Sequence, residues 1–558
     1  MTEPSARLAR LVKAGAVLAL LALPGLALGQ DNPHGLPAAA TQPPAEPHAV
    51  GPPTAEPQGP QPQAAQPQAA QPQAAQSQVA QPRAADLLPP PVKTHHTLRL
   101  PSKILNYIAE AGSIALPGAA GAKPAAEIFY VAYAREPLDA KRPITFVFNG
   151  GPGAAAAYLQ LGGIGPRVVE ANDQGELRGP PPRLVDNPST WLGMTDLVFV
   201  DPVGTGYGRA ADPKDEEKYW GVEQDTDALT DFVRLYLIGA ERMVSPVFLV
   251  GESYGGFRAV ALTRKLQTTG GISPSGMVLI SPALNFALLN SEDYDPLTWA
   301  LTLPSFAAVN LESKGVTGRE ALGSALKDAE RYALSDYLVA LASGAESGGK
   351  LASVKVAELT GLPLEIVERR LARVSPTLFI KEFDRAHGQM LSRYDGTVRG
   401  PDPNPASSLP SGPDPVLDAT APLWTSAFVQ YAGSELKFHT NAPYRLLNRE
   451  VRNKWDFGTS PTRQGYADVV DDLQQARATN PSLQVMIAIG YTDLITPYLA
   501  TTYLVNQLPT VAGAAPIEIK DYLGGHMLYM RPTTREALKE DAKAMYGRAL
   551  KGAFPPEG

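Results

Sequence analysis

Residues 246–267 read PVFLVGESYGGFRAVALTRKLQ, and this stretch decides the fold. The apolar run at 246–250 predicts a buried strand, and the apolar spacing of 257–267 predicts a helix. Between them stands Gly-Glu-Ser-Tyr-Gly, whose glycines permit a turn so tight that side chains at its flanks would collide. A strand, a sharp turn and a helix form the context of a nucleophile elbow. We therefore expect Ser253 to present its hydroxyl at the carboxyl end of a strand.

Further apolar runs are typical of strands buried on both faces, and they lie at residues 144–148, 196–200, 277–280 and 483–489. Helical patterns separate several of these runs, for example at residues 226–238. Strands that alternate with helices predict a parallel, doubly wound sheet. Short antiparallel strands are expected at one edge, at residues 98–100, 104–109, 113–116 and 128–134. The expected fold class is α/β, with a mixed, mostly parallel sheet.

The strand pattern stops after Pro282 and returns at about Gly465. The sequence between contains helical patterns at 319–342 and 354–373 and a proline-rich loop at 401–415. A separately folded domain is one interpretation. The strand at 483–489 needs a sheet to join, however, which favours an insertion that leaves the core and returns to it. We therefore expect two parts of one core, residues 94–285 and 465–558, and an inserted, mainly helical cap at residues 286–464.

The first 29 residues have the pattern of an export signal. Arg7, Arg10 and Lys13 precede an apolar run at 14–29 that ends in small residues. A membrane anchor is the alternative, but the run is short and is broken by Pro24. We expect cleavage of a signal peptide at 1–29, a periplasmic or secreted protein, and no membrane span afterwards.

Residues 30–93 form a linker rich in proline, glutamine and alanine, with a repeated Gln-Pro-Gln-Ala-Ala unit. Such a composition cannot bury a core, and it predicts an extended, solvated tether. The formal net charge of −7, without any lysine/arginine block, argues against a nucleic-acid partner. The chain contains no cysteine, so its stability must come without disulfides.

A serine hydroxyl needs a base to take its proton, and the base needs an orienting group. The chain has seven histidines, of which four lie in or at the end of the linker and two in the expected cap. Elimination leaves His526, in a loop after the strand expected at 517–522. Asp493 follows the strand at 483–489, and the order Ser253, Asp493, His526 is the one found in α/β-hydrolases. Asp493 could instead be the N-cap of a helix at 494–504.

An acyl-transfer site also needs two amide donors for the oxyanion. Tyr254, directly after the nucleophile, supplies one. The second is expected from Gly151, in the sequence Asn149-Gly-Gly-Pro-Gly153 that follows the strand at 144–148. A plain tight turn is the alternative. A phosphate-binding loop is disfavoured because Pro152 lacks an amide donor and no Lys-Ser/Thr pair follows.

Four blocks together resemble the serine carboxypeptidase family: Asn149-Gly-Gly-Pro-Gly153, Asp201-Pro-Val-Gly-Thr-Gly206, Gly251-Glu-Ser-Tyr-Gly255 and Gly525-His-Met527. They occur in the order of that family, and the resemblance spans about residues 95–545. It implies an α/β-hydrolase that releases C-terminal residues from peptide substrates through an acyl-enzyme on Ser253.

The resemblance further implies that Asn149 and Glu252 hold the terminal carboxylate of the substrate, with Gly150 and Met527 beside them. A carboxylate can face Glu252 only when the two share a proton, which raises one pKa and implies activity favoured at acidic pH. Neither a cofactor nor a metal is expected, because no histidine–carboxylate cluster has metal-ligand spacing. Two alternatives remain open: an esterase or acyltransferase with the same triad, and a non-catalytic binding protein of the cell envelope.

Overall fold

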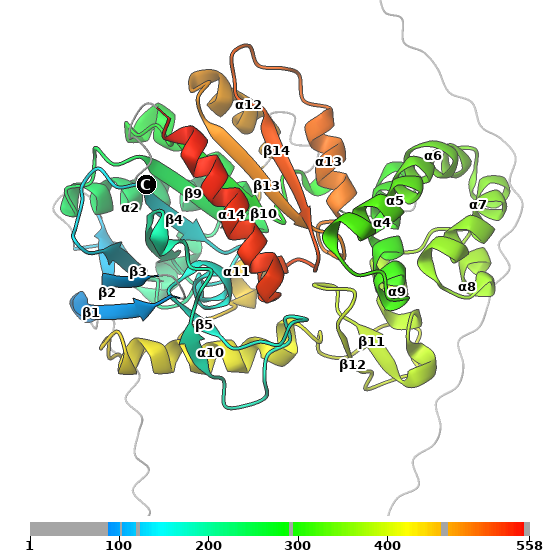
Figure 1. Ribbon diagram of the computed structural model, residues 1–558, viewed down its shortest axis with the longest axis horizontal. Helices are drawn as coiled ribbons and strands as arrows, with labels where there is room; N and C mark the ends of the chain where they lie inside the picture. The colour runs from blue at the N-terminus through cyan, green and yellow to red at the C-terminus, as the bar shows by residue number, and fades with distance from the viewer. Residues whose placement is uncertain (1–87, 101–102, 119–122, 290–293, 459–466, 552–558) are drawn as a thin grey trace, which may run out of the picture. The chain divides into compact units, whose positions relative to one another are not determined.

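The computed structural model describes residues 88–100, 103–118, 123–289, 294–458 and 467–551 (Figure 1). The expected signal peptide and nearly all of the expected linker lie outside these ranges. Within the described ranges, no helix combines the length and the apolar character that crossing a membrane requires.

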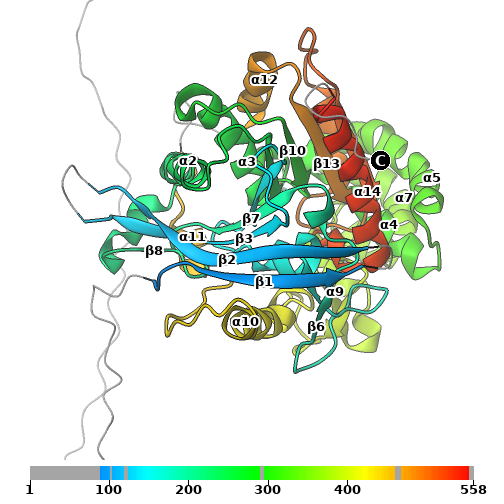
Figure 2. The ribbon, with the colours of Figure 1, turned by 60° about the vertical axis from the view of Figure 1, so that its left-hand side comes forward.

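A central sheet has the strand order β1-β2-β3-β7-β4-β9-β10-β13-β14, and β8 pairs with β3. Its strands are β1 (Val92–Arg99), β2 (Ile104–Leu116), β3 (Ala126–Arg135), β4 (Ile144–Phe148), β7 (Asp196–Asp201), β8 (Arg209–Ala210), β9 (Val247–Glu252), β10 (Gly276–Ile280), β13 (Gln484–Gly490) and β14 (Ile517–Tyr522). The six strands from β7 to β14 in this order are mutually parallel. The edge formed by β1, β2 and β3 is antiparallel, as Figure 2 shows. The predicted fold class, a mixed and mostly parallel α/β sheet, is confirmed.

Helices cover both faces of this sheet, which explains why its central strands are apolar along their whole length. One core contains Phe146 and Leu249 together with α2 (Val222–Gly239), α3 (Tyr254–Lys265), α12 (Val470–Thr479) and the start of α13 (Tyr498–Asn506). The other core contains Val147 and Phe248 together with α1 (Ala157–Leu159), α10 (Leu417–Ser434) and α14 (Pro532–Ala549). Alternate residues of each strand thus feed opposite cores.

Between β10 and β13 the chain passes through most of the remaining helices. These are α4 (Pro296–Ser313), α5 (Arg319–Tyr332), α6 (Leu338–Ala342), α7 (Ala345–Thr360), α8 (Leu364–Arg369), α9 (Pro376–Glu382) and α11 (Arg449–Lys454), with α10 before α11. Two small hairpins complete the fold: β5 (Arg167–Val169) with β6 (Leu184–Asp186), and β11 (Gln389–Leu391) with β12 (Arg399–Pro401). Helices α4 to α9 gather beside α13 in Figure 1, and α4 and α6 to α9 share a third apolar core, whereas the buried residues of α5 belong to the first core. Helix α10 packs on the sheet itself.

The structure differs from the sequence-based expectation in some elements. The two short strands expected at 104–109 and 113–116 are one strand, β2, because Gly112 continues the ladder opposite Tyr130. Gly112 has a steric reason to lack a side chain, since a Cβ atom there would lie 2.6 Å from the Cβ of Pro91. The helix expected at 319–342 is α5 and α6 joined by one π-helical turn, Ala333–Tyr337.

Candidate active site

The backbone holds Ser253 in a strained conformation at the junction of β9 and α3. Its φ is 58° and its ψ is −125°, in a region that residues with a side chain seldom occupy. The flanking glycines make this turn possible: a Cβ on Gly251 would lie 1.9 Å from the carbonyl oxygen of Gly255. A Cβ on Gly255 would lie 2.5 Å from the carbonyl oxygen of Phe148. The turn therefore accepts only glycine at these two flanks.

Asp493 and His526 are in direct contact. His526 Nδ1 lies 2.8 Å from Asp493 Oδ2, and both side chains are almost fully buried. Asp493 Oδ1 accepts hydrogen bonds from the amides of Ile495 and Thr496 at 2.7 and 2.9 Å. Asp493 thus caps a turn with one oxygen and contacts the imidazole with the other. It is not the N-cap of the following helix, because α13 begins at Tyr498.

The surroundings of the imidazole favour its charged form. Burial lowers the pKa of His526, but the charge and hydrogen bond of Asp493 and the charge of Glu252 outweigh burial, so the net shift is upward. An oriented imidazole whose protonated form is stabilised is what a general base for a serine hydroxyl requires.

Ser253 and His526 line one cavity of about 350 Å³. The three parallel strands that precede Ser253, Asp493 and His526 end at the same edge of the sheet, which is why residues so distant in sequence meet there. Among the described residues, no hydrogen bond joins Ser253 Oγ to the imidazole. Such catalytic contacts are often long without substrate and tighten when substrate binds.

Both expected oxyanion donors, Gly151 and Tyr254, line the same cavity. Tyr254 is the first residue of α3, so its amide has no partner within the helix and points out of the positive end of the helix dipole. Gly151 adopts a φ of +104°, which glycine tolerates and other residues do not. Its neighbour Gly150, also in the cavity wall, is pressed against the elbow, since a Cβ there would lie 2.6 Å from the amide nitrogen of Tyr254.

Of Asn149 and Glu252, the two residues expected to hold a terminal carboxylate, only Glu252 faces the cavity. Glu252 lines the cavity, and its Oε1 accepts a hydrogen bond of 3.0 Å from the Tyr529 hydroxyl. Asn149 Nδ2 donates to Glu252 Oε2, while Asn149 Oδ1 accepts from the amide of Leu159 at 3.0 Å. The side chain of Asn149 is buried behind Glu252 and is not part of the cavity wall.

Burial raises the pKa of the Glu252 carboxyl, although its hydrogen bonds and the nearby imidazole oppose the shift. Met527, the remaining expected binding residue, lines both this cavity and a second one of about 420 Å³. The second cavity has a largely apolar wall that includes Leu423, Trp424 and Met530. The two adjoining cavities thus share Tyr394 and Met527.

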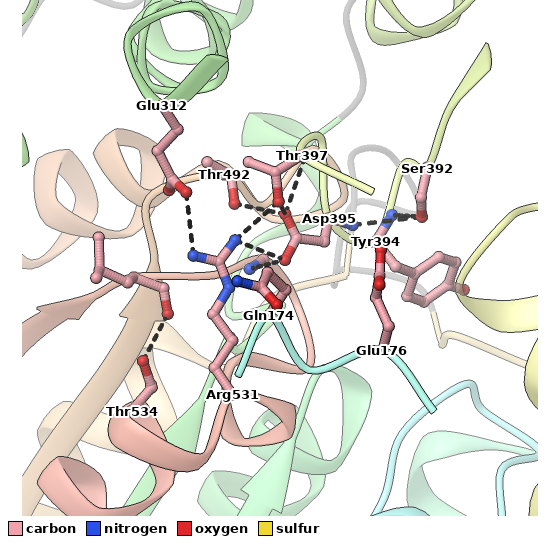
Figure 3. A network of polar contacts seen from close by, with 12 residues as sticks. Gln174, Glu176, Glu312, Ser392, Tyr394, Asp395, Thr397, Thr492, Arg531 and Thr534 are labelled. Carbon is pink, nitrogen blue, oxygen red and sulfur yellow. Dashed lines mark hydrogen bonds and ion pairs between the residues drawn. The ribbon is translucent and has the colours of Figure 1, made fainter. Parts of the chain in front are cut away.

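A polar network that the sequence did not reveal supports the loops of Asp493 and His526 (Figure 3). Asp395, which lies between β11 and β12, accepts hydrogen bonds from Thr492 Oγ1 at 2.8 Å and from the amide of Gly525 at 3.1 Å. Arg531 forms ion pairs with Asp395 at 3.3 Å and with Glu312 of α4 at 3.0 Å. These residues are spread over more than 200 positions, so no local motif could have indicated them.

No group of three or more histidine, aspartate or glutamate side chains in the described ranges is arranged to hold a metal ion. The fold and the site define an α/β-hydrolase with a serine, a histidine and an aspartate at the carboxyl edge of its sheet.

Comparison with known proteins finds similarity to serine carboxypeptidases over part of the chain. Residues 117–270 match the serine carboxypeptidase family model. It is 30% identical over 131 residues to a carboxypeptidase Y homolog of Arthroderma benhamiae, which is 23% of this chain and 24% of that protein. It is 36% identical over 125 residues to serine carboxypeptidase-like 51 of Arabidopsis thaliana, which is 22% of this chain and 24% of that protein.

The chain thus covers only about a quarter of the length of each of these two relatives. Among solved structures, it is similar to a prohormone-processing carboxypeptidase from Saccharomyces cerevisiae, with a TM-score of 0.49 and 16% sequence identity. That similarity covers 79% of this chain and 91% of the yeast chain.

Proposed function

We propose that this protein is an exported serine-type carboxypeptidase that releases C-terminal residues from peptides. One observation carries the proposal. The buried imidazole of His526, held by Asp493 at 2.8 Å, shares a cavity with Ser253 on its positive-φ elbow. A strained serine beside an oriented base is the arrangement that activates a hydroxyl for attack on a carbonyl carbon.

In the proposed reaction, Ser253 Oγ forms a bond to the scissile carbonyl carbon as His526 takes the hydroxyl proton. The amides of Gly151 and Tyr254 stabilise the oxyanion. His526 then gives its proton to the leaving nitrogen, the C–N bond breaks, and an acyl-enzyme on Ser253 remains. A water molecule, deprotonated by His526, attacks the acyl-enzyme, and Ser253 recovers its proton as the shortened peptide leaves.

The terminal carboxylate of the substrate would contact Glu252 in its protonated form, with Asn149 holding the Glu252 carboxyl from behind. Because burial raises the pKa of Glu252, the protonated form persists to higher pH than in a free glutamate. The proposal therefore includes activity favoured at acidic pH, where this carboxyl carries its proton. We also propose that the segment at 286–464 is a cap that helps to form the substrate cavity, since Arg393 and Tyr394 from this segment contribute to the cavity wall.

Labelling and digestion test the proposal together. We expect a fluorophosphonate probe to label the protein at Ser253, and a mixed peptide pool to lose residues one at a time from the C-terminus, as read by mass spectrometry. Ser253→Ala should abolish both results. Labelling without peptide trimming, together with turnover of small esters, would instead identify an esterase or acyltransferase. Failure of both labelling and turnover would identify a binding protein.

A further inference from the structure

The wall of the active-site cavity carries charged groups of both signs. Besides Ser253 and His526, it includes the ionisable side chains Glu252, Arg393, Asp414, Asp418, Arg449 and Arg452. Three of these are guanidinium groups, which remain charged at every physiological pH. The pairing of each arginine matters, because a guanidinium without an anionic partner attracts a ligand of the opposite sign.

The acidic residues of the wall are already engaged. Asp418 forms an ion pair with Arg449, which neutralises that arginine. Asp414 accepts hydrogen bonds from Ser392 Oγ at 2.7 Å and from three backbone amides at 2.9–3.0 Å, so its oxygens serve to shape the loop. Glu252 is bonded to Tyr529 and Asn149.

Arg393 and Arg452 are the other two arginines of the cavity wall. Within the described part of the chain, neither guanidinium forms an ion pair or a hydrogen bond, and both side chains are exposed toward the cavity. Desolvation lowers the pKa of Arg393 and the nearby charge of Arg452 lowers it further, whereas Tyr394, Asp414 and Asp493 oppose the shift without reversing it. The two cations are therefore close enough to repel each other, which a bound anion would relieve.

The backbone around each arginine is hydrogen-bonded to a different loop of the candidate active site. The carbonyl oxygen of Arg393 accepts a hydrogen bond of 3.1 Å from the amide of Leu494, next to Asp493. The carbonyl oxygen of Tyr394, the next residue, accepts one of 2.5 Å from the amide of His526. Arg393 is thus held directly against the loops that carry the aspartate and the imidazole.

Arg452 is held against the oxyanion loop. It lies on α11, and the segment just before this helix pairs with the glycine-rich loop: Ala154 forms a β-bridge with Leu447, and the amide of Asn448 donates to Gly153 O at 2.8 Å. A Cβ on Gly153 would lie 2.3 Å from the carbonyl oxygen of Asn448, so the contact is tight.

We propose that Arg393 and Arg452 form a carboxylate-binding subsite of this cavity and select substrates that carry a negative charge beside the scissile bond. The inference rests on the proposed function, because it assigns the charge to a peptide that Ser253 attacks. The carboxylate has two possible sources, the α-carboxylate of the terminal residue or the side chain of a glutamate or aspartate. Guanidinium groups are suited to either, since their planar donors match carboxylate geometry.

Two pairs of blocked dipeptides separate the sources. Acetyl-Phe-Ala with a free C-terminus is compared with its amide, and acetyl-Phe-Glu-amide with acetyl-Phe-Gln-amide. Binding is measured by calorimetry on the Ser253→Ala variant, which needs no turnover, so the result does not depend on whether Ser253 is the nucleophile. We expect the charged member of at least one pair to bind about tenfold tighter or more. We expect Arg393→Gln and Arg452→Gln to lose most of that preference.

Matched variants serve as controls for this interpretation. Arg393→Lys and Arg452→Lys keep the charge but not the planar donors, and they should retain part of the preference. Arg369→Gln removes an exposed arginine of α8 outside the cavity and should leave the preference intact. Thermal unfolding of each variant checks that it is folded. An unchanged preference in folded Arg393→Gln/Arg452→Gln double variants, or no preference in the Ser253→Ala protein itself, overturns the subsite.

Discussion

At the scale of single residues, two ionisable groups of the cavity define a pH range for the proposed reaction. His526 must be neutral to accept the proton of Ser253, so the rate should fall as pH drops below the pKa of the imidazole. Glu252 must be protonated to face a substrate carboxylate, so affinity should fall as pH rises above the pKa of its carboxyl. Both pKa values are raised relative to the free side chains.

The first prediction concerns the alkaline side of this range. We expect kcat/KM for a peptide substrate to be bell-shaped in pH, with its alkaline decline carried by KM. Glu252→Gln keeps the size of the side chain but removes its titration, so the alkaline decline should disappear while the acid side remains. Steady-state kinetics between about pH 4.5 and 8 measure both limbs. A flat KM in the unmodified enzyme would contradict the shared-proton account.

The sequence predicted residues well where a local motif existed. Ser253 stands in a five-residue pattern, and His526 was left after elimination of six other histidines. The predicted roles of Ser253, Asp493 and His526 remain to be tested by experiment. Arg393 and Arg452 could not be predicted, because their significance comes from the absence of partners in space, which no sequence pattern records.

At the scale of elements, the loop between β11 and β12 joins the loops that follow β13 and β14. Asp395 accepts from Thr492, the neighbour of Asp493, and from Gly525, the neighbour of His526 (Figure 3). Arg531 contacts the same oxygen of the Asp395 carboxylate, Oδ2, as the Gly525 amide does. We infer that Asp395 is a positioning residue, which sets the separation of the two loops without touching substrate.

The second prediction follows from this bridge. Asp395→Asn replaces a charged acceptor by a neutral one and so weakens the contacts to Arg531 and to the Gly525 amide. We expect kcat to fall by about tenfold with little change in KM, and the acid limb of the pH profile to shift as the imidazole loses its fixed orientation. Asp384→Asn is the control, because Asp384 pairs with Arg399 on the same segment but does not contact the two catalytic loops. Equal effects of the two substitutions, or an unshifted acid limb, would argue against positioning.

Element boundaries were predicted less well than element types. Each parallel strand of the core was expected within one or two residues of its position, because strands buried on both faces are continuously apolar. The long antiparallel strand β2 was divided in two, since glycine at position 112 resembles a turn residue when its neighbour Pro91 is not visible. Helix α10 was not predicted at all. Its buried apolar residues contact parts of the sheet that are distant in sequence, and the helix follows a proline-rich loop.

At the scale of the whole molecule, the core contains several carboxyl groups whose burial raises their pKa. The pKa of Asp201 is raised to about 7 and that of Asp521 to about 6, and those of Asp225 and Glu312 are also raised. A carboxyl that titrates higher in the folded state than in the unfolded state binds more protons when folded. Its contribution to stability is therefore present at low pH and is lost as pH rises toward the folded pKa.

The third prediction applies this sign to Asp201, at the carboxyl end of β7. Burial is the main cause of its raised pKa, and the hydrogen bond of 2.7 Å from the Ala156 amide opposes the shift. Raising a pKa from 3.8 to about 7 makes the free energy of unfolding fall by on the order of 3 kcal/mol between pH 4 and 7. Asp201→Asn keeps an acceptor for Ala156 and cannot ionise, so its unfolding midpoint should decline less over that range.

Urea or thermal unfolding of the two proteins at pH 4.5, 5.5, 6.5 and 7.5 tests this difference. Asp173→Asn, which changes an exposed carboxyl in a turn, serves as the control and should follow the unmodified protein. Parallel pH profiles for Asp201→Asn and the unmodified protein would mean that Asp201 does not titrate in this range. The measurement also bears on the active site, because Ala156 and Asn149 belong to one segment between β4 and α1. The hydrogen bond from the Ala156 amide favours the ionised carboxyl, so the titration of Asp201 changes the strength of a contact to the segment that carries Asn149.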